Sequence, residues 1–356
     1  MRTADFDFSL PPELIAQHPA ARRDASRLLL LKRAGGQIEH RQFHDLPELL
    51  RAGDLLVLND SRVIPARLRG ANARTGGSFE ILLVEEISVN DWWVMLRPAK
   101  RAGPGTQITL HDSRGHPAGV GATVVAANDH GDRRLKFSGV PDIRDQLERL
   151  GETPLPPYIQ RTRELPEDRE RYQTVFARAG GSVAAPTAGL HFTPELLEHC
   201  RARGVRVCFV TLHVGPGTFL PVKTSTLAAH KMHEERFAVG KETAGIVNEA
   251  KGSGRRVVAV GTTTVRVLED LAARNRGQIV ENTGKTGIFI HPPFRFRIVD
   301  ALLTNFHLPR STLLMLVSAF ADPGGTGGRD MMLAAYAEAI RERYRFYSYG
   351  DAMLLI

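Results

Sequence analysis

Several patterns that mark common enzyme classes are missing from this chain of 356 residues. It has no GxGxxG segment after a strand, no phosphate-binding loop of the form GxxxxGKS or GxxxxGKT, no GxSxG turn and no CxxC pair. These absences remove the usual sequence support for a dinucleotide-dependent dehydrogenase, a P-loop nucleotide hydrolase and an α/β-hydrolase. They also weaken the case for a Rossmann-type methyltransferase.

Cysteines and long apolar runs are scarce as well. Only Cys200 and Cys208 occur, and their spacing fits neither a metal-binding pair nor a disulfide framework, so we expect two buried apolar side chains in a reducing compartment. The longest apolar run, 313–320, is about half the ~18 residues that a membrane span needs. The first residues contain no apolar segment typical of a signal peptide, so the expected location is the cytoplasm.

Positive charge is in excess, with 47 Lys and Arg against 39 Asp and Glu and a formal net charge of +8. Arginines gather near the start and near the end of the chain, as Arg22, Arg23 and Arg27 and as Arg341, Arg343 and Arg345. Such an excess favours a polyanionic partner, because Lys and Arg displace condensed counterions from phosphates. Solvated faces with salt bridges would give the same composition.

The hydrophobic pattern divides the chain into two parts. Between 66 and 139, short β-rich runs are separated by Gly, Asn, Asp and Pro at intervals close to the ~8–12 residues typical of small barrels. The flanking parts alternate between strand and helix patterns. We predict an α/β fold in which residues 1–65 and 140–356 form a discontinuous domain with a mostly parallel sheet and flanking helices. Residues 66–139 are predicted to be an inserted, small antiparallel β-barrel domain.

Within the α/β part, individual elements can be predicted from their boundaries. Thr193 is a good N-cap followed by Pro194, and Gly204 can end the helix that begins there. Further helices are expected at 241–252, 263–274, 311–321 and 330–344, and strands at 54–58, 205–210, 256–260 and 287–290.

Five segments concentrate glycine, hydroxyl, histidine and amide residues at the ends of predicted strands, where α/β proteins place their sites. These segments are 185–193, 211–219, 230–235, 258–266 and 304–316. In one of them Gly261 and three threonines open a helix, whose free N–H groups and dipole favour an anion. Plain N-capping by Thr262 or Thr263 explains the same residues.

The other segments leave similar alternatives open. His213, Gly215 and Gly217 form either a ligand-binding loop or a hydrogen-bonded turn. The stretch from His230 to Glu235 has the residue types of a metal or proton-transfer site, but its spacing lacks the HExxH pattern of zinc peptidases. We therefore predict no metal.

Taken together and in order, long stretches of the chain resemble the S-adenosylmethionine:tRNA ribosyltransferase-isomerase family of queuosine biosynthesis. The stretches that carry the resemblance are 8–19, 24–28, 53–68, 170–177, 186–192, 213–219, 230–235, 261–263, 304–309 and 344–353. One departure is Pro293, which stands where this family is expected to have glycine.

This resemblance implies a substrate, a reaction and a set of partners. The substrate would be tRNA whose wobble base is 7-aminomethyl-7-deazaguanine, and S-adenosylmethionine would be a co-substrate, with no true cofactor. Transfer and isomerisation of its ribosyl part would give epoxyqueuosine-tRNA, adenine and methionine. The family also implies a cytosolic monomer that contacts no membrane and an α/β domain with an inserted β-barrel.

The implied chemistry needs a base, proton donors and few free waters, because its intermediates are reactive. The candidates for acid–base roles are His191, His213, His233, Glu235 and His307. The residues expected to cradle S-adenosylmethionine are Gly215, Gly217, Thr218, Gly261, Thr262 and Thr263. The residues expected to bind the deazaguanine edge or tRNA are Asn59, Asp60, Arg62, Arg67, Asp300 and Asn305. For Asp60 and Asp300 a structural cap is an alternative.

Two other classes of function remain open. A tRNA-binding protein without catalysis would explain the charge and the barrel, but not the five loops. A metal-dependent hydrolase would use His213, His230, His233 and Glu235.

Overall fold

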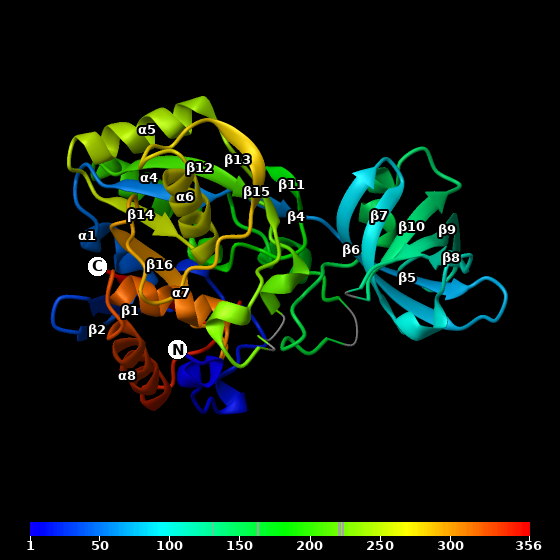
Figure 1. Ribbon diagram of the computed structural model, residues 1–356, viewed down its shortest axis with the longest axis horizontal. Coiled ribbons are helices and arrows are strands. Elements are labelled where there is room, and N and C mark those ends of the chain that lie inside the picture. Colours follow the sequence, from blue (N-terminus) through cyan, green and yellow to red (C-terminus); the bar gives the residue numbers. More distant parts are fainter. Residues whose placement is uncertain (130, 162–163, 220–221, 223) are drawn as a thin grey trace.

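The computed structural model describes residues 1–129, 131–161, 164–219, 222 and 224–356, with the side chains of 218 and 219 excepted. A large sheet covered by helices forms one part, and a closed barrel lies beside it (Figure 1). The chain enters the barrel from strand β4 (Ser61–Val63), which pairs with β11 (Ala179–Ser182) in a small parallel sheet. The predicted fold class, α/β with an inserted antiparallel barrel, is confirmed.

Among the described residues, the large sheet has nine strands. In spatial order they are β15 (Asn282–Thr286), β13 (Glu235–Val239), β12 (Arg206–Leu212), β3 (Leu55–Asn59), β14 (Val257–Val260), β16 (Ala301–Asn305), β17 (Ala352–Leu355), β1 (Arg27–Lys32) and β2 (Gln37–Gln42). The central neighbours β12, β3, β14 and β16 are all parallel, as is the pair β17 and β1. The outer pairings are antiparallel, as is the contact between β16 and β17, so the sheet as a whole is mixed.

Helices cover both faces of this sheet. The helices, in chain order, are α1 (Leu46–Leu49), α2 (Leu147–Leu150), α3 (Asp168–Arg171), α4 (Pro194–Ala202), α5 (Lys241–Gly252), α6 (Thr262–Arg274), α7 (Thr312–Ala321) and α8 (Gly328–Arg341). Alternate residues of a strand point to opposite faces. Accordingly Leu55 and Val57 pack with α5 to α8, whereas Leu56 and Leu58 pack with α1 and α4.

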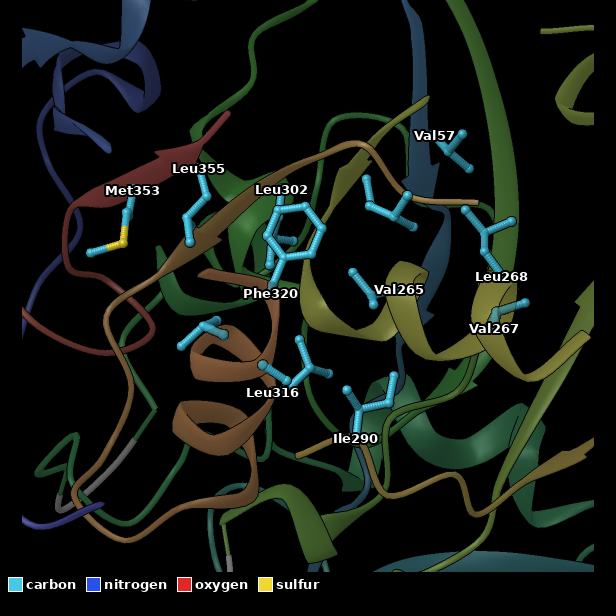
Figure 2. Close-up of a cluster of buried hydrophobic side chains, with 14 of the residues drawn as sticks. Val57, Val265, Val267, Leu268, Ile290, Leu302, Leu316, Phe320, Met353 and Leu355 are labelled. Atoms are coloured by element: carbon cyan, nitrogen blue, oxygen red, sulfur yellow. The ribbon is translucent and has the colours of Figure 1, made fainter. Parts of the chain in front are cut away.

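The larger of the two cores lies between the sheet and helices α6 and α7. Figure 2 shows Val57 and Leu302 of the sheet beside side chains of both helices, among them Val265, Leu316 and Phe320. All five are buried, with at most 2% of their surface exposed. Burial of one such side chain contributes about 1.5–3 kcal/mol, which is why apolar runs without alternation form these central strands.

The barrel closes with six antiparallel strands in the described part of the chain. They are β5 (Arg67–Asn72), β6 (Ser78–Ser88), β7 (Asp91–Arg97), β8 (Gln107–His111), β9 (Pro117–Ala127) and β10 (Arg133–Ser138). Ile143, Leu147 and Leu150 belong to the same core as the barrel strands. The segment after the last strand therefore packs on the barrel, beyond the predicted boundary at 139.

Most predicted elements are present, and one is displaced. Helix α5 has the predicted bounds, and Thr193 caps α4 by accepting a hydrogen bond from the Leu196 N–H at 3.1 Å. The prediction of a strand over 287–290 is wrong, because these residues are irregular. The strand in this region is β15, which begins five residues earlier, at Asn282. Burial of Ile290 against the core, rather than strand pairing, accounts for the apolar residue in that stretch.

A candidate active site at the carboxyl edge of the sheet

The predicted site segments meet because four parallel strands are neighbours. Strands β12, β3, β14 and β16 all end at the same edge of the sheet. Asn59 and Asn305 are the last residues of β3 and β16, while His213 and Gly261 directly follow β12 and β14. The parallel arrangement thus brings together residues that lie far apart in the sequence.

A cavity of about 600 Å³, here termed the central cavity, opens at this edge. Four segments form its walls. They are Ala184–Ala188, Gly261–Thr263 at the start of α6, Thr304–Leu308 at and after the end of β16, and the pair Tyr347 and Ser348. The end of the segment Ala184–Ala188 overlaps the 3-10 helix η7 (Thr187–His191), and the small side chains there leave the space open. Tyr347 and Ser348 were not predicted as site residues, although they lie in a stretch that carries the family resemblance.

Asn305 lies in the wall of the central cavity and is tied to His191 behind it. The Asn305 Nδ2 lies 3.1 Å from the His191 Nε2, and the His191 Nδ1 lies 2.7 Å from the Ser26 Oγ. Because the amide NH₂ can only donate, the imidazole accepts at Nε2 and donates from Nδ1 to the serine. The amide Oδ1 is buried and has no hydrogen-bond partner among the described residues. It is an acceptor available to a ligand.

Both histidines beside this cavity are held neutral. Burial lowers the pKa of His191 to about 3, with the nearby Arg345 acting in the same direction. Burial alone lowers the pKa of His307 to about 3. The His307 Nε2 lies 2.9 Å from the Thr304 Oγ1. Neither side chain is an imidazolium that could donate a proton at neutral pH, and their ring nitrogens are engaged by Asn305, Ser26 and Thr304, so their arrangement suits positioning better than proton transfer.

A second cavity, the interdomain cavity of about 1470 Å³, lies between the barrel and the sheet edge. His213, Gly215, Gly217, His233 and Glu235 line it from the α/β part, and Glu85, Trp93, Met95 and Asp132 line it from the barrel. The Lys285 Nζ lies 2.7 Å from the Glu85 Oε1 and links the two parts. Val214 lines both cavities, so they are neighbours.

Charge in the interdomain cavity suits a cationic ligand. Its lining contains four carboxylates, Glu85, Asp132, Glu234 and Glu235, against the two cations Arg236 and Lys285, and a third cation, Arg266, pairs with Glu235 from behind the lining. An excess of carboxylates in a walled cavity attracts positive groups and stabilises them there. A sulfonium or an ammonium group fits this lining.

Glu235 holds the loop that follows β12. Its Oε1 accepts a hydrogen bond from the Gly215 N–H at 2.9 Å, and its Oε2 pairs with the Arg266 guanidinium. Both side chains are about 95% buried. Because both carboxylate oxygens are engaged, one by the loop and one by Arg266, the geometry favours positioning of the loop as the role of Glu235.

His213 has the properties of a proton acceptor. Burial, and secondly the charge of Arg236, lower its pKa below the ordinary value, so the imidazole is neutral at pH 7. Its Nδ1 has no hydrogen-bond partner within the described residues. Gly181, with φ +136°, lies so close that a Cβ there would be 3.1 Å from the ring. The ring is thus held by packing while one nitrogen stays unpaired.

The other predicted residues of the S-adenosylmethionine group lie at the two cavities. Gly261 adopts φ +86°, which suits glycine, and α6 begins there without a side-chain cap, so its first turn meets the central cavity. Gly217 packs against His233, where a Cβ would lie 2.8 Å from the ring. The side chain of Thr218 lies outside the described part of the chain.

Asn59 and Asp60 are engaged within the protein. The Asn59 Nδ2 donates to the Leu212 carbonyl at 3.0 Å, and its Oδ1 accepts from the Leu212 N–H at 3.0 Å. Asp60 is paired with Arg178 at 2.9 Å and accepts from the Thr211 hydroxyl at 2.6 Å. Both residues therefore join β3 to β12 rather than offering free groups to a ligand.

The structure does not bring Arg62, Arg67 or Asp300 to the central cavity. Arg62 is exposed on β4, and Arg67 donates to the Leu155 carbonyl at 3.0 Å at the base of the barrel. Asp300 precedes β16 and so lies at the opposite edge of the sheet, where it pairs with Lys251 at 2.8 Å.

Within the residues that the structure describes, no group of three or more His, Cys, Asp or Glu side chains could hold a metal ion. The described helices include none long and apolar enough to cross a membrane.

Comparisons with known proteins cover nearly the whole chain. A family model described as "Queuosine biosynthesis protein" matches residues 3–355. A protein of Symbiobacterium thermophilum named S-adenosylmethionine:tRNA ribosyltransferase-isomerase is 51% identical over 356 residues, which is all of both chains. The crystal structure of S-adenosylmethionine tRNA ribosyltransferase from Thermotoga maritima is 43% identical and has a TM-score of 0.56; the match covers 99% of this chain and 100% of that one.

Proposed function

Because the chain belongs to the queuosine biosynthesis protein family, we propose that it is an S-adenosylmethionine:tRNA ribosyltransferase-isomerase. It acts on tRNA with 7-aminomethyl-7-deazaguanine at the wobble position and yields epoxyqueuosine-tRNA, adenine and methionine. S-adenosylmethionine is consumed as a co-substrate, and the reaction needs no further cofactor. The enzyme acts as a monomer in the cytoplasm.

The reaction depends on one proton removal. The sulfonium of S-adenosylmethionine acidifies the hydrogens on its 5′ carbon, so a neutral base can take one of them. The C4′–O4′ bond then breaks, and adenine leaves C1′ with a proton as O4′ becomes a carbonyl oxygen. The aminomethyl nitrogen adds at C4′ and loses a proton, C5′ bonds to C1′, and the resulting alkoxide closes the epoxide on C5′ as methionine leaves. A base for the first step must be unprotonated at neutral pH and must lie on the cavity that holds the sulfonium.

His213 is the base in this proposal. The observation that carries it is the imidazole ring, which lines a cavity rich in carboxylates, has a lowered pKa and keeps a buried Nδ1 without a partner among the described residues. The same carboxylates attract the sulfonium. Gly215 leaves room for the co-substrate to approach the backbone of the loop, whereas Gly217 packs against His233.

The central cavity holds the deazaguanine. Asn305 supplies there an Oδ1 that has no partner among the described residues, and a guanine-like edge offers N–H groups from which this oxygen can accept hydrogen bonds. The first turn of α6 at Thr262 and Thr263 suits the carboxylate of S-adenosylmethionine, where the two cavities adjoin at Val214. The co-substrate and the proton acceptor His213 thus meet at the wall that the two cavities share.

The deciding experiment mixes the protein with S-adenosylmethionine and tRNA that carries the aminomethyl base, and quantifies adenine and methionine. The control tRNA has ordinary guanine at the wobble position. Equal release of adenine and methionine with the first tRNA only is expected. Release of S-adenosylhomocysteine would instead identify a methyltransferase, and tRNA binding without any release would identify a non-catalytic binding protein.

A further inference from the structure

Three arginines from distant parts of the chain line one small cavity behind His191. Arg23, Arg171 and Arg345 form its walls together with Ser26 and His191. We call it the arginine pocket. In the described part of the chain no Asp or Glu lines it. Three like charges around one cavity are unfavourable unless an anion or a buried carboxylate balances them.

The hydrogen bonds of these arginines leave their charge in place. Most of their partners are backbone carbonyl oxygens, which carry no net charge. Arg23 donates to Leu190 at 3.1 Å and Glu170 at 2.8 Å, Arg171 to Ala20 at 2.5 Å and Ala21 at 3.3 Å, and Arg345 to His18 at 3.4 Å. These bonds fix the guanidinium groups in position. In addition, the Arg171 Nε is buried and has no acceptor among the described residues.

Two carboxylates act on the group from outside the lining, Glu170 on Arg23 and Asp351 on Arg345. The Asp351 carboxylate lies 3.5 Å from the Arg345 guanidinium. Its oxygens also accept hydrogen bonds from the backbone N–H groups of Arg27 at 3.1 Å and of Arg345 at 2.8 Å. Burial, and then the charge of Arg171, lower the pKa of Arg23, which shows that the positive charges act on one another. The pocket keeps an excess of positive charge.

We propose that the arginine pocket binds a phosphate group. Fixed guanidinium groups present paired N–H donors that match the oxygens of phosphate, and they recognise it without reading a base. The same donors would accept a backbone phosphate of tRNA or free inorganic phosphate.

The position of the pocket favours tRNA as the source, and this part of the inference rests on the proposed function. Ser348 lines both the arginine pocket and the central cavity, and His191 of the pocket is hydrogen-bonded to Asn305 of the cavity. A nucleotide whose base enters the central cavity would therefore bring a neighbouring phosphate to these arginines. The pocket anchors the backbone while the cavity holds the base.

The test compares Arg345→Gln with the matched surface control Arg201→Gln, whose side chain is half-exposed and paired with Glu198 on α4. The affinity for tRNA is measured across a range of salt concentrations. Loss of one phosphate contact is expected to weaken binding and to lower the slope of log Kd against log salt by about 0.7–0.9. The control is expected to keep the wild-type slope.

Two further measurements separate a binding role from a structural one. Arg345→Lys keeps the charge and is expected to restore most of the salt slope, which a purely structural defect would not allow. Thermal unfolding is followed in potassium phosphate and in potassium chloride of equal ionic strength. Saturable stabilisation by phosphate that Arg345→Gln abolishes, with an unchanged tRNA slope, would support the phosphate pocket and identify free phosphate as its source.

The proposal is overturned if Arg345→Gln changes neither the salt slope nor the response to phosphate. That result would leave the proposed function intact, because adenine release is measured independently. Conversely, a lowered salt slope in a protein that releases no adenine would support the phosphate pocket and contradict the proposed reaction.

Discussion

The two ends of the same central strands differ in how their polar side chains are satisfied. At the amino ends Asp54 pairs with Arg256, and Asp300 pairs with Lys251 and accepts the Val257 N–H at 2.8 Å. At the carboxyl ends, His213 and Asn305 each keep a buried atom without a partner among the described residues. Unpaired buried groups reduce stability and are rare, so the two at the carboxyl ends indicate where a ligand supplies the missing partners.

The largest expected difference between the edges is in catalysis. His213→Gln removes the proposed base and is expected to lower the rate of adenine release by a factor of about 10²–10⁴. The free energy of unfolding should change little, because the lost Nδ1 has no partner among the described residues. The control is His116→Gln on the barrel, whose side chain is 74% exposed. A variant as active as the control would exclude His213 as the base.

Substitutions at the amino ends of these strands should change the stability of the protein rather than its catalytic rate. Asp54 is buried, accepts from Arg256 at 3.0 Å and also accepts the Arg51 N–H at 2.8 Å. Asp54→Ala leaves that guanidinium without its partner and is expected to cost about 3 kcal/mol of unfolding free energy, measured by urea denaturation. Adenine release per folded molecule should stay at the wild-type level. A large loss of activity in fully folded protein would contradict the division between the edges.

The pH dependence of stability tests the neutral histidines of the carboxyl edge. Folding lowers the pKa of His191 and His307 from 6.5 to about 3, so below pH 6.5 the unfolded chain binds more protons than the folded one. Their contribution is complete above pH 6.5 and is lost as the pH falls toward 3. Within that window, each histidine should lower the free energy of unfolding by about 1.4 kcal/mol for every pH unit of decrease. Urea denaturation between pH 7.5 and 5 measures this slope. His307→Gln should make this slope shallower; an identical slope would contradict the assignment.

The smallest expected effect concerns Asp300, for which base binding and a structural cap were both predicted. Asp300 and Lys251 are about one third exposed, so water screens their attraction. Asp300→Asn is therefore expected to cost at most about 1 kcal/mol of stability and to leave the KM for tRNA unchanged. A large rise in that KM would show that the opposite edge of the sheet also contacts tRNA.

The elements that were predicted well have strong local signals. Helix α5 has the predicted bounds because its apolar residues repeat at helical spacing between breakers, and Thr193 caps α4 as its residue type indicates. Strands β1, β16 and β17 were not predicted. Their short apolar runs, such as Leu28–Leu31, are equally compatible with a buried helix, and length or spacing cannot separate the two.

The site could be predicted as a set of loops but not as a set of roles. His213 and Gly261 were expected because they follow predicted strands, and Asn305 because it lies in a polar segment before an apolar helix. Their partners were not: the link from Ser26 through His191 to Asn305 joins segments that have no common pattern. The barrel residues of the interdomain cavity were missed for the same reason, since no local signal shows which barrel strand faces the sheet.

The sequence by itself determined the family, the α/β fold with its inserted barrel and the loops that carry the site, because each of these depends on residue types in order along the chain. Only the tertiary structure decided which polar atoms are paired and which are not. It placed Asp60 beside Arg178 and left the Nδ1 of His213 and the Oδ1 of Asn305 without partners among the described residues. It also gathered Arg23, Arg171 and Arg345 around one pocket. Hydrogen bonding, burial and charge balance are properties of neighbours in space, and strand order sets those neighbours.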